Sequence, residues 1–234
     1  MTSPTLAPYI RALEAYIDAK DNTRAQRMPD AFAPDAELTI SLATSTITFP
    51  ARTVGLDAIT KTLVTDFGAT YTRCRTYYVC DSLKVRDGVI DALPWLVVMR
   101  EPAAGALRVG HGVYRWTFDE TPAVSRFHIH IARMDVVPDA DGALLDALQE
   151  GLSYPWLAPA ELHARFTELA RTTPALSFVD AFALPSASNK AARARKNPSS
   201  IKNPCPRGCG AGISCRASGA QLSLRAINAR LMRD

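Results

Sequence analysis

Two alternating segments decide the fold: LRVGHGVYRWTF at Leu107–Phe118 and SRFHIHIARMDV at Ser125–Val136. Successive side chains of a β-strand point to opposite faces, so each segment predicts a long strand, and Asp119–Val124 predicts the hairpin turn between them. On the second strand this alternation puts His128 and His130 on one face. The other face then receives the apolar side chains Phe127, Ile129 and Ile131.

Helical periodicity comes before this hairpin. Leu6–Lys20 carries apolar side chains at the i, i+3, i+4 spacing of an amphipathic helix, and we expect a second short helix over Thr23–Met28. A third helix is expected over Ala58–Phe67, where Gly68 is a typical terminator. Two further segments alternate like the opening pair and extend it into an antiparallel meander of four strands: Thr70–Leu83 and Val89–Arg100.

A short β pair is expected between the helices, with Glu37–Leu42 as one strand and the β-branched segment Thr44–Phe49 as its partner. After the meander, the patterns predict helices over Leu144–Leu152 and Ala158–Thr172, and the apolar segment Phe178–Leu184 could pack back on the domain. We therefore expect a domain over residues 1–137, a helical extension over 138–185 and a tail over 186–234.

The tail differs from the rest of the chain in composition. Residues 187–234 hold ten of the 27 basic residues and one of the 23 acidic ones, so the preceding part has a net charge of −5. The tail has no aromatic residue, and such a segment buries too little apolar surface to offset its ordering entropy, so we expect disorder with a short helix over Leu222–Met232. Weak, salt-dependent nucleic-acid binding by the tail is one interpretation. Translation past a frameshift is another.

The sequence also gives expectations for the location of the protein and for its metal content. No apolar run reaches the roughly 18 residues of a membrane span, and the N-terminus lacks the features of a signal peptide, so we expect a cytoplasmic protein with no membrane contact. Cys74 and Cys80 are expected as buried free thiols. The tail cysteines lack a fourth ligand at zinc-ribbon spacing, and we expect neither a metal nor a cofactor; these cysteines are Cys205, Cys209 and Cys215.

Three local matches resemble the nuclear transport factor 2-like superfamily, and within it the SnoaL-like and ketosteroid-isomerase-like proteins. They are Ala15-Tyr-Ile-Asp-Ala19, Phe32-Ala-Pro-Asp-Ala36 together with Gly55-Leu-Asp-Ala-Ile59, and Phe118-Asp-Glu120. The resemblance covers roughly residues 6–137. It implies an α+β fold in which a cone-shaped, curved antiparallel sheet packs on N-terminal helices around an apolar pocket. Members are enzymes or binding modules, so the fold does not fix activity.

The resemblance also implies site residues. In steroid-isomerase-like members a first-helix tyrosine and a late-strand acid form an oxyanion hole, an arrangement known for its environment-tuned acids. Tyr16 occupies the matching helix position, and Tyr114 occupies the position of the acid. The carboxylate that shuttles the proton would fall near Ile40 and Ser41, neither of which is an acid.

Alignment on the hairpin turn puts His128 and His130 on the pocket face beside Tyr114. The sequence then predicts Tyr16 and Tyr114 as hydrogen-bond donors and one or both histidines as general base. The pocket walls would be Trp95, Trp116, Phe118 and Met134. The alternative is that the histidines face solvent and Phe127, Ile129 and Ile131 face the core. A metal site at the histidines would need a third ligand, and strand alternation separates His111 from the pair.

Two functions remain from the sequence. The first is a SnoaL-like enzyme that isomerises, cyclises or dehydrates a small apolar carbonyl or polycyclic substrate by acid/base catalysis. The second is a non-catalytic module of the same fold that binds a small molecule or dimerises. A homodimer is expected, formed through an outer sheet face carrying Phe127, Ile129 and Ile131. A pocket that encloses the histidines with Tyr16 favours the enzyme, and one filled by Trp116, Phe118 and Met134 favours the module.

Overall fold

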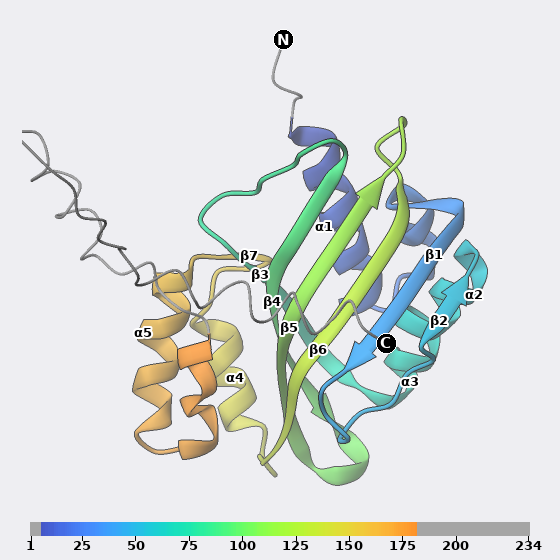
Figure 1. The fold of residues 1–234 in the computed structure, drawn as a ribbon. Helices are drawn as coiled ribbons and strands as arrows, with labels where there is room; N and C mark the ends of the chain where they lie inside the picture. Colours follow the sequence, from blue (N-terminus) through green and yellow to red (C-terminus); the bar gives the residue numbers. More distant parts are fainter. Residues whose placement is uncertain (1–5, 182–234) are drawn as a thin grey trace, which may run out of the picture. The chain divides into compact units, whose positions relative to one another are not determined.

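The structure is a computed structural model that describes residues 6–181 (Figure 1). Seven strands form one sheet: β1 (Phe32–Leu42), β2 (Arg52–Val54), β3 (Thr72–Val79), β4 (Val89–Glu101), β5 (Ala106–Phe118), β6 (Val124–Pro138) and β7 (Trp156–Leu157). The α-helices are α1 (Ala7–Asp21), α2 (Leu56–Thr60), α3 (Asp66–Thr70), α4 (Ala143–Glu150) and α5 (Pro159–Ala170). A π-helical turn, Lys61–Thr65, joins α2 to α3, and 3₁₀ turns cover Ala25–Asp30, Pro102–Ala104 and Pro174–Ala181.

The strand order is β2-β1-β6-β5-β4-β3-β7. The predicted meander β3-β4-β5-β6 and the α+β class are confirmed, but the sheet is mixed because β1 pairs with β6, and β7 with β3, in parallel. The expected partner of β1 was wrong. Arg52–Val54 pairs with it, while residues 44–49 form a loop. Thr46 in that loop accepts a hydrogen bond on its carbonyl oxygen from Arg108 at 3.0 Å, which fixes the loop against β5.

Helices cover the two faces of the sheet differently (Figure 1). The inner face packs on α1, α2 and α3, and these elements share one buried apolar cluster rich in aromatic rings. Over β3, β4 and β5 the outer face packs on α4 and α5 through a second apolar cluster, which includes Tyr77, Leu148 and Phe166. The part of the outer face formed by β1, β6 and the adjoining half of β5 carries polar side chains instead. The sheet therefore has one helix-covered half and one polar half on its outer side.

A β-bulge sets which side chains of β6 face inward. Gly112 of β5 pairs with Ile131, but His111 pairs with Arg133, so Ala132 is an extra residue without a partner. A bulge of this kind shifts the two-residue alternation by one position and bends the strand. As a result Ile131 and Met134 both face inward, which simple alternation along the strand does not predict.

Within residues 6–181, no helix is long and apolar enough to cross a membrane. The predicted free thiols are confirmed for Cys74, which is buried, and for Cys80, which is half-buried. The predictions for the tail lie outside the described residues. These are its disorder, the helix over Leu222–Met232 and the three tail cysteines.

Candidate functional site

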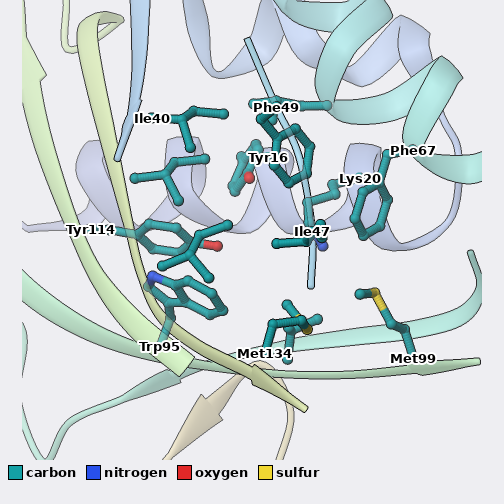
Figure 2. A pocket seen from close by; sticks show the side chains of 14 residues that line it. Tyr16, Lys20, Ile40, Ile47, Phe49, Phe67, Trp95, Met99, Tyr114 and Met134 are labelled. Carbon is teal, nitrogen blue, oxygen red and sulfur yellow. The ribbon is translucent and has the colours of Figure 1, made fainter. Parts of the chain in front are cut away.

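A small cavity lies between the inner face of the sheet and the helices (Figure 2). Its volume is about 30 Å³, close to the space that one water molecule occupies in the liquid. Most of the wall is apolar and comes from β1, β4, β6, the helical segment 61–70 and the 44–49 loop: Ile40, Ile47, Phe49, Leu63, Phe67, Trp95, Val97, Met99, Ile129, Ile131 and Met134. The three polar contributors are Tyr16, Lys20 and Tyr114.

The two tyrosines are hydrogen-bond donors at the cavity (Figure 2). Burial raises the pKa of Tyr16, and the pKa of Tyr114 is also raised well above its usual value by burial, so both phenols stay protonated. Among the described residues, the buried Tyr16 hydroxyl has no partner at normal hydrogen-bond geometry, and the polar group that it interacts with is the Tyr114 hydroxyl. A buried polar group without a partner is costly, so this hydroxyl is a candidate contact for a ligand atom.

Lys20 reaches the same cavity from the last turn of α1, but its ammonium is fully engaged. Its Nζ donates to Oδ1 of Asp21 at 2.9 Å, to Oγ1 of Thr76 at 2.7 Å and to Sγ of Cys74 at 3.3 Å. Burial acts to lower the pKa of Lys20, but its neighbours, first among them the charge of Asp21, together outweigh burial and the pKa is raised. The lysine therefore remains a cation, and burial raises the pKa of the neighbouring Cys74 thiol to about 12, so that the thiol is neutral.

Aromatic packing fills the space beside the cavity. The rings of Trp116 and Phe127 stack with centroids 3.7 Å apart, and the rings of Trp95 and Tyr114 stack at 5.1 Å. Among the predicted wall residues, Trp95 and Met134 line the cavity, whereas Trp116 and Phe118 are buried in the surrounding core. Aromatic rings therefore fill most of the interior, and the cavity that remains beside them is small.

The expected placement of His128 and His130 was wrong. Tyr114 lies opposite Ile129 in the β5–β6 ladder, whereas His128 lies opposite Arg115 and His130 opposite Val113. Directly paired residues of an antiparallel ladder share a face, so both histidines are on the outer face. The interpretation with the histidines turned away from the core is the one observed. The apolar set Phe127, Ile129 and Ile131 is buried and unavailable as a dimer surface.

The outer histidines belong to a polar row across β1 and β6. Thr39 Oγ1 lies 2.8 Å from Nδ1 of His128, and Ser41 Oγ lies 3.2 Å from Nε2 of His128 and 2.9 Å from Nδ1 of His130. His111 shares this face, because alternation on β5 places it with Val113 and Arg115, the partners of His130 and His128; the predicted separation was wrong since it assumed that the histidine pair shares a face with Tyr114. Within residues 6–181, no group of three or more His, Cys, Asp or Glu side chains is arranged to hold a metal ion.

We expect this row to make folding stability depend on pH. Burial lowers the pKa of both histidines from 6.5, and for His128 the charges of His130 and Arg115 lower it further. A lowered pKa in the folded state stabilises the protein above the unfolded value of about 6.5, and this contribution is lost as the pH falls through the folded values. The melting temperature should fall between about pH 7 and about pH 5. The fall should be smaller in a variant with His128→Asn and His130→Asn. An equal fall in this variant would show that the two histidines do not cause the pH dependence.

Comparison with known proteins gives structural likenesses only. No protein-family model and no curated protein matches the chain. A nuclear transport factor 2-like protein from Burkholderia xenovorans matches at 11% identity and a TM-score of 0.41, covering 59% of this chain and 94% of its own. A hexachlorocyclohexane dehydrochlorinase matches at 13% identity and a TM-score of 0.43, and the match covers 56% of this chain and 87% of that protein. A computationally designed 17-OHP binder matches at 13% identity and a TM-score of 0.42, and the match covers 55% of this chain and 98% of that protein.

The fold resembles that of nuclear transport factor 2-like proteins. The predicted resemblance agrees with the kind of structure that these matches have, and the matches themselves are similarities at TM-scores of 0.41 to 0.43. Likenesses at this identity concern the fold alone, so the chemistry of the site rests on its own side chains.

Sequence reasoning missed Lys20 and Asp21. Both lie at the end of the predicted first helix, where charged residues usually face solvent. Here α1 ends against β3, so the Asp21 side chain is 1% exposed and that of Lys20 is 8% exposed. The signal that could have found them is the polar pair Cys74 and Thr76, which alternation places on the same face of β3.

Proposed function

We propose that this chain binds a small apolar molecule that carries one hydrogen-bond acceptor, and that it does not transform that molecule chemically. The proposal rests on one observation: the polar groups that line the cavity are all donors. Tyr16 and Tyr114 keep their protons, Lys20 remains a cation and its N–H groups are engaged by Asp21, Thr76 and Cys74. A neutral acceptor such as a carbonyl oxygen fits the unpartnered hydroxyl of Tyr16.

The catalytic alternative lacks a base at this place. Proton abstraction next to a carbonyl needs a carboxylate or a neutral imidazole within hydrogen-bond reach of the substrate. Among residues 6–181, no Asp, Glu or His lines the cavity, and Ile40 lies where the resemblance would require the shuttling acid. Acid/base catalysis by His128 and His130 stays a prediction that the cavity does not favour, because both side chains are on the outer face.

The cavity must adjust to hold more than a water-sized group. Met99 and Met134 line it, and their unbranched thioethers can change rotamer at low cost. A compact, flexible wall of this kind suits a molecule of a few carbon atoms better than a rigid polycycle. The dimer and the cytoplasmic location that the sequence predicts remain predictions.

Two isosteric probes test the binding proposal. Cyclopentanone carries an acceptor, and methylenecyclopentane has the same shape without one. Binding is followed by NMR titration of the ¹⁵N-labelled indole groups of the three tryptophans, with Trp95→Phe used to assign the Trp95 signal. We expect the ketone to bind more tightly and to shift the Trp95 signal most. Equal affinity for the two probes would overturn the proposal.

Tyr16→Phe should weaken ketone binding about fivefold, because a neutral hydrogen bond contributes about 1 kcal/mol. Its matched control is Tyr77→Phe, which also removes a buried hydroxyl, but on the helix-covered outer face. The control should leave ketone affinity unchanged. The same loss in both variants would show that the effect is not a contact in the cavity.

Deuterium incorporation tests the absence of catalysis. A base beside the bound ketone would speed the exchange of its α-protons in D₂O. We expect the exchange rate of cyclopentanone to be the same with the wild-type chain as with the Tyr16→Phe variant. Faster exchange with the wild-type chain would favour the enzyme and contradict the proposal.

A further inference from the structure

The polar row on the outer face brings a serine between two imidazoles. Ser41 of β1 pairs with His130 of the parallel strand β6, and Thr39 pairs with His128, so four side chains lie in two adjacent rows of the sheet. These strands lie side by side, away from α4 and α5 (Figure 1). All four side chains are half-buried, so solvent can reach them.

The distances leave two arrangements of the hydrogen bonds in this cluster. A neutral imidazole has one donor and one acceptor nitrogen. If Ser41 donates to Nδ1 of His130, it accepts from Nε2 of His128, whose Nδ1 then accepts from Thr39. If Ser41 donates to Nε2 of His128 instead, the remaining bonds can reverse together. In both arrangements the Ser41 proton points at an imidazole nitrogen, which is the geometry of a hydroxyl nucleophile beside its base.

Besides a nucleophile and a base, the cluster has a residue that orients the base, Thr39. In the second arrangement Thr39 accepts from Nδ1 of His128 at 2.8 Å, and this bond holds the ring and its tautomer in place. Burial lowers the pKa of both histidines, so they are neutral and able to accept a proton near pH 7. The cluster therefore contains a nucleophile, a base and a residue that positions the base.

We propose that Ser41 is a nucleophile that takes an acyl group from esters on this face. The Oγ atom of Ser41 attacks the ester carbonyl carbon while an imidazole nitrogen accepts its proton. The bond from that carbon to the leaving oxygen then breaks, and the alcohol leaves with the proton. Water, deprotonated by the same imidazole, releases the acid and restores Ser41. No oxidant, metal or cofactor enters this balance.

A groove of about 430 Å³ beside the cluster indicates the class of ester. Thr39 and His128 line it together with Arg115 and Arg126, and its one carboxylate, Glu37, is bonded to Arg52 at 2.7 Å. Arg115 has Asp91 3.7 Å away, and both side chains are exposed. Guanidinium groups favour carboxylate ligands. The ester expected here carries a carboxylate on its leaving group, directed to the arginines while its carbonyl lies at Ser41.

Two acetyl donors test the proposal near pH 7: 4-acetoxy-3-nitrobenzoate and its neutral methyl ester. We expect a burst of released phenol and one acetyl group on Ser41, located by peptide mass spectrometry of the full chain. Ser41→Ala should remove both. Ser125→Ala is the matched control, because this β6 hydroxyl donates only to the carbonyl oxygen of Thr117, and it should keep both. Acetylation confined to lysines or histidines, or no burst, overturns the proposal.

Two further variants separate the base from the groove. The double variant His128→Asn and His130→Asn should slow acetylation of Ser41 about 100-fold, the usual scale of a general base. Arg126→Ala should slow reaction with the carboxylate ester about tenfold and leave the methyl ester unchanged. A double variant as fast as the wild-type chain overturns the role of the histidines, and equal rates for the two esters in the wild-type chain overturn the role of the groove.

Discussion

Replacing Asp21 by alanine is expected to lower the free energy of unfolding by about 4 kcal/mol, because it leaves the Lys20 ammonium buried without its counter-charge. The carboxylate is 1% exposed. Besides Lys20 it accepts hydrogen bonds from the Thr76 backbone N–H at 2.5 Å, the Thr76 hydroxyl at 3.0 Å and the Tyr154 hydroxyl at 3.0 Å. Each of these donors would lose its partner at once. Urea unfolding followed by tryptophan fluorescence measures the loss.

Asp18→Ala is the control for this prediction, since it removes a carboxylate one turn earlier on α1. Asp18 pairs with Arg24 at 3.0 Å and Arg27 at 3.2 Å on the surface, where ion pairs contribute less than about 1 kcal/mol. Adding Lys20→Met to Asp21→Ala should restore part of the stability, because it removes the uncompensated charge. A double variant less stable than Asp21→Ala would show that the lysine contributes through another contact.

Gly112→Ala is expected to cost about 3 kcal/mol or more, because the added methyl group has no space. A Cβ at this position would lie 1.8 Å from the carbonyl oxygen of His130 and 3.0 Å from Cζ2 of Trp95. The close neighbour is backbone, so relief requires β5 and β6 to separate beside the bulge. The same urea experiment measures the loss, and it should come with a change at the cavity because Trp95 is part of the wall.

Gly110→Ala is the matched control, two residues away on the same face of β5. There the Cβ would meet Cε of Met134 at 2.3 Å and Sδ at 2.7 Å, which are the flexible end of a side chain. It also comes within 3.1 Å of the Arg133 carbonyl oxygen. We expect a loss of about 1 kcal/mol. Losses of equal size at the two glycines would mean that backbone crowding at Gly112 is not the cause.

Local patterns predicted the fold well where one face of an element is buried along its whole length. The alternation of Leu107–Phe118 and the helical spacing of Leu6–Lys20 both correspond to observed elements, β5 and α1. The loop at 44–49 was missed because β-branched side chains there fill a cavity wall through Ile47 rather than pair in a sheet. The parallel pairing of β1 with β6 depends on contacts far apart in the sequence, which local periodicity does not report.

The residues of the candidate site also fall into those that local sequence patterns predict and those that they do not. Tyr16, Tyr114 and Trp95 line the cavity as the sequence predicts, because helix position and strand alternation determine which way they point. Met134 also lines it, but it faces inward because of the bulge at Ala132, which the sequence pattern does not report. Alternation along β6 shows that His128 and His130 lie on one face and that Phe127, Ile129 and Ile131 lie on the other. It does not show which of these two faces is buried, because the period is the same either way. The helical pattern alone did not identify Lys20 and Asp21 as buried, because their environment is supplied by β3 and by Tyr154, which is 133 residues away from Asp21.

Ala132 shows that one extra residue in a strand can change the shape of this interior without changing which side chains line it. It has no partner on β5, while Ile131 before it and Met134 after it keep their inward direction. Removing this one residue would leave the order of inward and outward side chains along β6 unchanged. What would be lost is the bend of the strand over the cavity. Relatives with and without the extra residue could therefore share the same wall residues and still enclose cavities of different size.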